Sequence, residues 1–309
     1  MNLPSLTDKQ MDHPSPHHHN PSGRLLLSVV LNAMITLIEI LGGILSNSLA
    51  LVSDAIHNLS DTLALALAWL ANRVGKRKPD TRHTFGYQRI EILSAFINAS
   101  ILTAVSVYLI YEAIIRFLHP EPVKSGLMFI IAMFGLFANL ISMLFLHRDS
   151  KHSMNIKAAY LHLLGDTLSS VAVVGGAILI RYTGIQWIDP GLTLIISIII
   201  IRQAYLILRE STDILMQSTP GHLNLEDVKT LLEKHPLVRN VHHIHCWQLQ
   251  DRKVHFEAHL ETCLDMKLSD SGELRAEIET MLHDHFKINH VTLQIEYDMC
   301  EDRDMIKMP

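Results

Sequence analysis

Long apolar stretches occupy the first two thirds of the chain, and they set the first structural prediction. A helix needs about 20 apolar residues to cross the hydrocarbon core of a bilayer. Six stretches have roughly this length, and the first two are separated only by Ser46–Ser48. The pattern therefore predicts six transmembrane helices, at Leu25–Leu45, Leu49–Ala71, Ile92–Tyr111, Leu127–Leu146, Ala158–Ile180 and Ile188–Leu208.

Beyond Arg209 the periodicity becomes that of a small soluble domain. In the segment 254–261 the even-numbered residues, from Val254 to Leu260, are apolar, and the odd-numbered ones, from His255 to Glu261, are polar. This alternation is typical of a half-buried strand. The predicted elements are a helix at 225–235, strands at 240–249 and 254–261, a helix at 274–286 and a strand at 291–297. Their order, αββαβ, predicts an open-faced α+β domain of ferredoxin-like type.

Composition divides the chain at the same place. Charged residues make up only 18% of the 309 residues, and hydrophobic ones 49%. Residues 221–309 contain 17 acidic and 10 basic residues, a net charge of −7, so the formal total of −5 leaves +2 for the first 220. We expect a disordered, His-containing arm at 1–23, a six-helix transmembrane domain at 24–212 and a soluble domain at 213–309, for which the orientation and the family resemblance described below imply a cytoplasmic location and metal binding.

Basic residues in the short loops predict the orientation in the membrane. The segment Arg73–Arg82 contains five lysines and arginines, and Arg148–Lys157 contains three. The alternate loops contain fewer: none at Ser46–Ser48, Arg116 and Lys124 between the third and fourth spans, and Arg181 alone before the last. Because basic loops stay on the cytoplasmic side, both termini are predicted to be cytoplasmic. We expect a multi-pass protein of the inner, or plasma, membrane.

The cysteines favour a reducing compartment for the soluble part. There are three of them, Cys246, Cys263 and Cys300, and all follow the last predicted span. An odd number in this position is not the pattern of a disulfide framework. A cytoplasmic location of the C-terminal domain agrees with the orientation above.

A pair of ionisable residues occurs twice at membrane depth, with identical spacing. His57 precedes Asp61 by four residues, and His162 precedes Asp166 in the same way. Four residues are close to one helical turn, so the members of each pair share a face. Such residues cost about 2.5 to 3.5 kcal/mol each on insertion scales, which suggests a function. If the two faces meet, the nitrogen and oxygen ligands suit tetrahedral Zn²⁺; hydrogen bonding between helices is the alternative.

The expected function, which the family resemblance described below implies and the chemistry of this site fits, is a secondary transporter that exports Zn²⁺ in exchange for protons. Imidazole titrates near pH 6.5, so Zn²⁺ and protons compete for it. The nearest alternative keeps the mechanism with Cd²⁺, Co²⁺, Fe²⁺ or Mn²⁺, although histidine ligands disfavour the harder Mn²⁺. A non-transporting membrane metal sensor is a second alternative, but an anchor has no need of buried carboxylates.

Other classes of function lack their sequence signals. There is no H-E-x-x-H motif, so an intramembrane zinc enzyme is disfavoured and we expect no enzymatic activity. There is no phosphate-binding loop and no basic nucleic-acid patch either. We therefore expect an ion gradient rather than ATP as the energy source, and no nucleic-acid partner.

These residues resemble the cation diffusion facilitators, in particular the zinc transporters of bacteria and animals. The likeness covers nearly the whole chain. The resemblance implies a homodimer of six-helix protomers with metallochaperone-like cytoplasmic domains, and metal/proton antiport with the ion held by both His–Asp pairs. Besides those pairs it rests on the segments Ser48–Ala55, His83–Tyr87, Thr219–Pro220 and Val241–Trp247.

The resemblance also implies a metal site in the cytoplasmic domain. Its ligands map onto His242, His259 and Glu296, which would bind zinc as a regulatory ligand. A solvated polar face of the sheet is the alternative interpretation. His245, His290 and Cys300 are nearby candidates, and the tract His17–His19 could either capture metal for this domain or have no role.

A third site of the family lies before the third span and uses one aspartate and two histidines. Here Asp80 and His83 match, but Tyr87 replaces the second histidine. We therefore expect this site to be weak or absent. Asp54 lies on the same stripe as Asp61, and we expect it to have a structural hydrogen-bonding role, with ligation or a proton relay as the alternatives. Four further polar residues are expected to serve packing or line a cavity rather than bind metal: Glu39, Asn98, Glu112 and Asn139.

Overall fold

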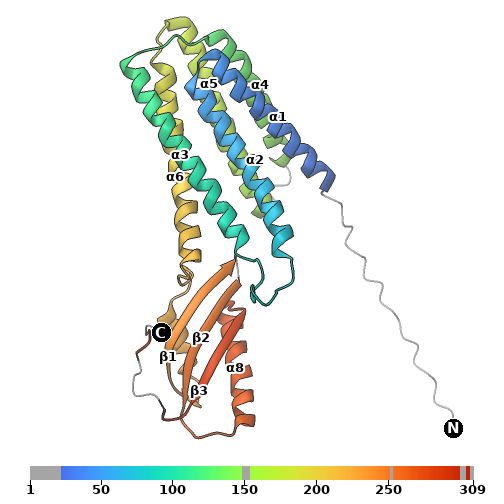
Figure 1. The fold of residues 1–309 in the computed structure, drawn as a ribbon, viewed down its shortest axis with the longest axis vertical. Coiled ribbons are helices and arrows are strands. Elements are labelled where there is room, and N and C mark those ends of the chain that lie inside the picture. The colour runs from blue at the N-terminus through green and yellow to red at the C-terminus, as the bar shows by residue number, and fades with distance from the viewer. Residues whose placement is uncertain (1–21, 148–153, 251–252, 300–303, 307–309) are drawn as a thin grey trace, which may run out of the picture.

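Six long helices form an elongated bundle at one end of the molecule, and a small α+β domain forms the other end (Figure 1). The computed structural model describes residues 22–147, 154–250, 253–299 and 304–306, so His17–His19 and Cys300 lie outside it. The bundle consists of α1 (Ser22–Ser46), α2 (Leu49–Gly75), α3 (Ile90–Leu118), α4 (Ser125–His147), α5 (Met154–Thr183) and α6 (Ile188–Leu215).

Four helices of the described part are long and apolar enough to cross a membrane. They lie in α3 to α6, and their most apolar windows have mean hydropathies of 1.9, 2.3, 1.9 and 2.1. Helix α1 adds the shorter apolar stretch Asn32–Ser46. Large apolar side chains point outward from the bundle, for example Phe134 at 67% and Trp69 at 63% exposure. Helices that are apolar on their outer faces are suited to a lipid environment.

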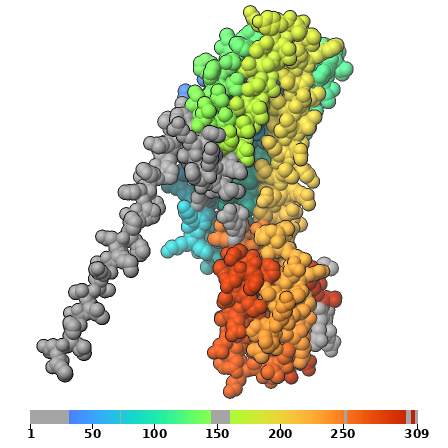
Figure 2. All heavy atoms as spheres, turned by 180° about the vertical axis from the view of Figure 1, so that it is seen from behind, coloured from blue at the N-terminus to red at the C-terminus, as the bar shows by residue number. Residues whose placement is uncertain are grey.

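Helix α2, which contains the first His–Asp pair, lies at the centre of the bundle. It packs against α1, α3, α5 and α6, while α4 pairs with α5 (Figure 1). The bundle core includes Leu51 of α2, Met128 of α4 and Val173 of α5. From the opposite side, α4, α5 and α6 line the visible face, and the C-terminal domain lies below α6 (Figure 2).

A carboxylate from α6 fixes the start of α2. Asp189 accepts hydrogen bonds from the main-chain N–H groups of Leu49, at 2.8 Å, and Ala50, at 3.3 Å. It also accepts one from the hydroxyl of Ser48, at 2.5 Å. The first N–H groups of a helix have no partner inside the helix, and they form its positive end. Asp189 therefore caps α2 from another helix, a role that the sequence analysis did not identify.

The C-terminal domain has the predicted element order, αββαβ. Strand β1 pairs antiparallel with β2, and β2 pairs parallel with β3. The apolar side of β2, including Phe256 and Leu260, packs against Val228 of α7 and Ile278 of α8. The elements are α7 (Leu225–Leu232), β1 (Val238–Gln250), β2 (Lys253–Thr262), α8 (Leu268–Phe286) and β3 (His290–Glu296).

Most predicted boundaries agree with the structure within a few residues, but α3 and α6 continue beyond their predicted ends at Tyr111 and Leu208, to Leu118 and Leu215, and α8 begins at Leu268, well before the predicted start at Leu274. Its first turn consists largely of polar residues, which resemble a loop in composition. Asp270 in that turn faces the positive end of the helix, where a negative charge is favourable.

Candidate metal centres

The two predicted His–Asp pairs meet between α2 and α5. Nε2 of His162 lies 3.2 Å from Oδ2 of Asp61, across the interface between the helices. Nε2 of His57 lies 3.4 Å from Oδ1 of Asp166, in the reverse direction. Within each helix the histidine and the aspartate are 3.7 Å apart. Each imidazole thus contacts both carboxylates, and the two imidazole rings lie 6.1 Å apart.

The centre is buried on one side and open on the other. The side chains of Asp166 and His57 are 8% and 12% exposed, whereas that of His162 is 48% exposed. One ligand atom each from His57, Asp61 and Asp166 lies within 4.8 Å of the others. Two carboxylates supply the charge to balance a divalent cation, and the imidazoles supply the nitrogen ligands that zinc favours. His162 is placed to complete the set from the open side.

A second layer of polar contacts ties the helices together around this centre. Asp54 of α2 accepts hydrogen bonds from the hydroxyls of Ser169, at 2.5 Å, and Ser170, at 3.2 Å, both on α5. Asn139 of α4 donates to the hydroxyl of Ser170 at 3.2 Å. These contacts agree with the structural role expected for Asp54 and Asn139.

The other polar residues of the bundle also have local partners. Asn58 donates to the buried carboxylate of Glu39, at 3.1 Å, and joins α2 to α1. Asn98 donates to the hydroxyl of Ser60, at 3.1 Å. Glu112 pairs with Arg116 one turn along α3, at 3.4 Å. Each contact fits a packing role.

The loop before α3 uses its aspartate internally. The carboxylate of Asp80 accepts the main-chain N–H groups of Arg82, at 2.8 Å, and His83, at 2.7 Å. The hydroxyl of Tyr87 donates to it at 3.2 Å, and Nδ1 of His83 lies at the same distance. The main-chain donors lower the pKa of Asp80 to about 2. This carboxylate already closes a turn, which fits the expectation of a weak or absent metal site.

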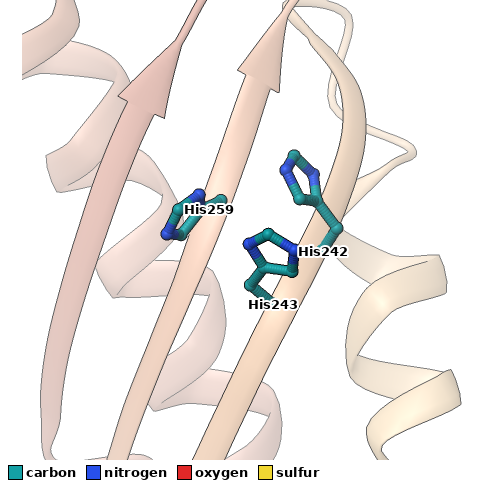
Figure 3. A group of neighbouring side chains, drawn as sticks. All are labelled: His242, His243 and His259. Carbon is teal, nitrogen blue, oxygen red and sulfur yellow. The ribbon is translucent and has the colours of Figure 1, made fainter. Parts of the chain in front are cut away.

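Three histidines gather on β1 and β2 of the C-terminal sheet (Figure 3); His242 is buried, and His243 and His259 are half-buried. His242 of β1 lies opposite His259 of β2 in the strand pairing. The ring of His243 lies 4.8 Å from that of His242 and 4.7 Å from that of His259. Glu296 contacts Nδ1 of His259 through its carboxylate. The residues implied by the resemblance, His242, His259 and Glu296, are thus neighbours, and His243 joins them.

The alternation of side chains along a strand did not predict that His243 would lie beside His242 and His259. Adjacent residues of a regular strand point to opposite faces, so His243 should lie away from His242. The strand contains a register shift between His242 and His245, and His243 has a φ of 49°. This bulge turns the His243 ring towards His242 and His259. The only signal in the sequence was the run of histidines itself.

The other nearby histidines lie elsewhere on the sheet. His245 pairs with Glu257 on β2. His290 lies beside His255, with 4.7 Å between the ring centres. Among the described residues, neither belongs to the three-histidine group. Burial lowers the pKa of His242 below its usual value, which favours the neutral form that binds metal.

Comparison with known proteins covers both domains. Residues 25–216 match the family described as cation efflux transmembrane domain, and residues 220–298 match the cytoplasmic domain of cation efflux proteins.

Known relatives match this chain over most of its length and most of their own. The chain is 40% identical over 291 residues to the zinc transporter ZitB of Pectobacterium atrosepticum, covering 93% of this chain and 90% of the relative. It is 38% identical over 290 residues to the metal cation efflux system protein CzcD of Cupriavidus metallidurans, with coverages of 93% and 91%. It is 37% identical over 285 residues to a cadmium, cobalt and zinc/H(+)-K(+) antiporter of Bacillus subtilis, with coverages of 91% and 91%.

Proposed function

Because the chain belongs to the cation efflux family, we propose that it exports Zn²⁺ from the cytoplasm in exchange for protons. The convergence of His57, Asp61, His162 and Asp166 at one point between α2 and α5 carries this proposal. Relatives named as zinc transporters support the ion, and a relative named as a proton- and potassium-coupled antiporter supports exchange.

The chemistry of the centre suits exchange between a metal ion and protons. A Zn²⁺ ion binds to neutral imidazole and ionised carboxylate, so protons must leave these groups when it enters. Protons that arrive from the acidic side of the membrane can displace the ion again. The same four side chains then hold either the ion or protons. Release of one is therefore coupled to binding of the other, and Zn²⁺ and protons cross the membrane in opposite directions. Zinc is the cargo of this site, and the protein acts as a transporter rather than an enzyme.

The proposed arrangement in the membrane has six spans. The main chain at the start of α2 donates a hydrogen bond to Asp189 at the start of α6. Because α6 is long and apolar enough to span a membrane, we expect α2 to cross the membrane beside it. Helix α1 forms a hairpin with α2 and is the remaining one of the six proposed spans. The arm 1–23 and the ferredoxin-like domain 213–309 are then cytoplasmic, the domain 24–212 lies in the inner membrane, and the protein works as a homodimer.

Zinc is not the only ion that fits. The relative from Bacillus subtilis is named for cadmium and cobalt as well as zinc. Both ions accept mixed nitrogen and oxygen ligands, so they are the second candidates for transport, and potassium is the second candidate for the exchanged ion. Iron and manganese fit less well, because two imidazoles favour softer cations. A purely sensory role would leave the carboxylates at membrane depth without a purpose.

The site can be tested by removing one anionic ligand. In everted vesicles, Asp61→Ala or Asp166→Ala is expected to reduce zinc uptake to background while the protein still inserts, because a buried cation loses half of its compensating charge. Asp80→Ala is the matched control, since it removes a carboxylate outside the centre, and it should retain uptake. Wild-type uptake by Asp166→Ala would refute the four-residue site.

The orientation has an independent test. In a cysteine-free background, a cysteine at position 122 should react with an impermeant reagent added from outside, and a cysteine at position 78 should not. Position 122 lies in the loop between α3 and α4, beside the turn of the α1–α2 hairpin, where Asn47 donates to the carbonyl of Pro122. The reverse labelling pattern would invert the proposed topology and place the C-terminal domain outside.

A further inference from the structure

We propose that Arg116 holds a gate closed at the extracytoplasmic end of the bundle, so that the metal centre of the described structure opens to the cytoplasm alone. When this gate opens, the ion can leave to the other side. The inference rests on the proposed function and orientation, which define the two sides. Two observations carry it: burial changes abruptly along the bundle at the level of the metal centre, and hydrogen bonds join the three turns at one end.

The four side chains of the metal centre differ in exposure according to their level in the bundle. Helix α2 runs towards the C-terminal domain and α5 runs away from it (Figure 1). Asp61 and His162 are therefore the pair nearer that domain, and their side chains are 30% and 48% exposed. His57 and Asp166 lie one turn further from it, at 12% and 8%. The centre is thus open towards the cytoplasmic end and covered towards the other.

Helix α2 shows the same change along its length. Every residue from Leu49 to Ser60 is buried or half-buried. Beyond the centre, the four consecutive residues 63–66 are all exposed. Four consecutive residues point to all sides of a helix. The cytoplasmic part of α2 is therefore uncovered in the described structure, whereas its first part is surrounded by other helices.

The space between the centre and the extracytoplasmic end is filled by apolar side chains. Val173 and Ala177 of α5 are completely buried, and so are Leu51 of α2 and Met128 of α4. All four belong to one continuous core cluster. Protein cores pack as densely as organic crystals and leave no path for a hydrated ion. An ion in the centre can therefore leave to this side only after the helices separate there.

Hydrogen bonds join the three turns at the end of the bundle opposite the C-terminal domain (Figure 1). Lys124, just before α4, donates its main-chain N–H to the carbonyl of Ser46 at the end of α1, at 2.9 Å. Val123 donates its N–H to Oε1 of Gln186, between α5 and α6, at 2.9 Å. The turns α1–α2, α3–α4 and α5–α6 are thus connected in one layer above the buried core.

Arg116 of α3 ties the turn between α1 and α2 to this layer. Its guanidinium donates to the carbonyl of Asn47 at 2.8 Å and to Oδ1 of the same residue at 3.0 Å. Glu112 lies 3.4 Å and Glu121 3.6 Å from the guanidinium. Asn47 in turn donates its side-chain amide to Glu121 at 2.9 Å. One arginine therefore holds the start of α2, the helix of the metal centre, against α3.

The contacts of Arg116 can break without unfolding a helix. Asn47 lies in a turn and Glu121 is exposed, so water can replace the guanidinium at both. The contacts of Asp189 differ, because they complete the first turn of α2 and are buried. A hinge motion between packed helices needs a closure that forms and breaks in each cycle. Arg116 acts on the position of α2 rather than on the ion, so it is a positioning residue.

The test follows two single cysteines in a cysteine-free, full-length parent protein, reconstituted in vesicles without zinc. Ala177→Cys lies in the buried core between the gate and the centre, and Leu65→Cys lies one turn beyond Asp61 on the cytoplasmic side. A small impermeant thiol reagent is added from one side at a time. In the parent, Leu65→Cys should react from the cytoplasmic side, and Ala177→Cys should react only slowly from outside.

The variant Arg116→Ala should change the two rates in opposite directions. Ala177→Cys should react about tenfold faster from outside, because hydrogen bonds of a charged group are lost, and Leu65→Cys should react more slowly from the cytoplasm. Arg116→Lys keeps the charge but not the planar fork, so its rates should lie between those of the parent and Arg116→Ala. Arg181→Ala is the matched control, since it removes an exposed arginine at the same end of the bundle, and it should change neither rate.

Equal rates in Arg116→Ala and the parent would overturn the proposal. Faster reaction at both cysteines would overturn it as well, because an arginine that only stabilises the fold would loosen the bundle on both sides when removed. Labelling with the two sides exchanged would overturn it together with the orientation. Loss of zinc transport from the parent with the expected labelling would support the gate and refute only the proposed function, so the two failures are distinguishable.

Discussion

We propose that the choice of ion is decided by single ligands in the membrane centre. Asp61 and Asp166 provide charge for any divalent cation, whereas His57 and His162 provide the nitrogen atoms that separate zinc from harder ions. His57 is the more buried of the two imidazoles, at 12% side-chain exposure against 48% for His162. A change at His57 should therefore affect selectivity without opening the centre to solvent.

We predict that His57→Asp keeps measurable transport and shifts its preference towards Mn²⁺. The substitution exchanges a nitrogen ligand for an oxygen ligand in the buried half of the centre, and oxygen ligands suit harder cations. Competition between Zn²⁺ and Mn²⁺ for uptake into everted vesicles measures the shift. An unchanged preference would show that His57 does not contact the transported ion.

The grouping of the four membrane side chains follows from the sequence pattern more directly than the grouping of the three histidines on the C-terminal sheet. His57, Asp61, His162 and Asp166 lie on regular helices, where the spacing alone determines the face. His243 lies at a bulge that alternation could not reveal. Such a bulge depends on residues distant in the sequence, here Asp304 and Met305, whose carbonyls accept hydrogen bonds from the main-chain N–H groups of His243 and Ile244. Periodicity along one strand contains no information about it.

At the level of elements, the position of α2 depends on a charge from α6. Asp189 caps the start of α2 and is completely buried, while Arg116 of α3 donates to the carbonyl of Asn47 in the same hairpin at 2.8 Å. The capping aspartate lies far from Leu49 in the sequence, so rules for local helix caps could not predict it. The cap places His57 and Asp61 at a fixed depth relative to α6.

We predict that Asp189→Ala destabilises the bundle by more than an ordinary exposed cap, which contributes about 0.5 to 2 kcal/mol. The substitution leaves two main-chain N–H groups and the hydroxyl of Ser48 without their acceptor in a buried position. Thermal unfolding in detergent should show a lower midpoint for Asp189→Ala than for the wild type. The midpoint of Asp189→Asn should lie between the two, because its side chain keeps one oxygen acceptor. Equal midpoints for Asp189→Ala and the wild type would contradict the cap.

At the level of the whole molecule, the loop between α2 and α3 rests on the C-terminal sheet. The ring of Phe85 meets His255 edge-on at 5.3 Å, and Trp247 stacks on the same imidazole at 5.5 Å. Lys253 donates to the side chain of Gln88 at 3.3 Å. The loop follows directly from α2, so this contact joins the helix of the metal centre to the domain of the three histidines.

We predict that this contact weakens in acid. Burial lowers the pKa of His255, and the positive charges of His290, Lys253 and Arg89 lower it further. The separated state then binds more protons than the docked state, so docking is complete above about pH 6.5 and is lost as pH falls through the lower pKa of the docked ring.

Fluorescence of Trp247 reports this titration once Trp69 and Trp187 are replaced by phenylalanine, because a protonated His255 would quench the indole stacked on it. The midpoint should lie below pH 6.5 and rise towards it in Phe85→Ala, which uncovers the imidazole. A midpoint that does not respond to Phe85→Ala would mean that the loop does not cover His255.

Exchange of zinc for protons is tested most directly in proteoliposomes that contain only this protein and a pH-sensitive dye in the lumen. With an acidic lumen, zinc added outside should enter, and each uptake trace should be matched by alkalinisation of the lumen. Both signals should vanish in Asp166→Ala. Zinc entry at the same rate with and without the pH gradient, and with no change in lumenal pH, would contradict proton-coupled export.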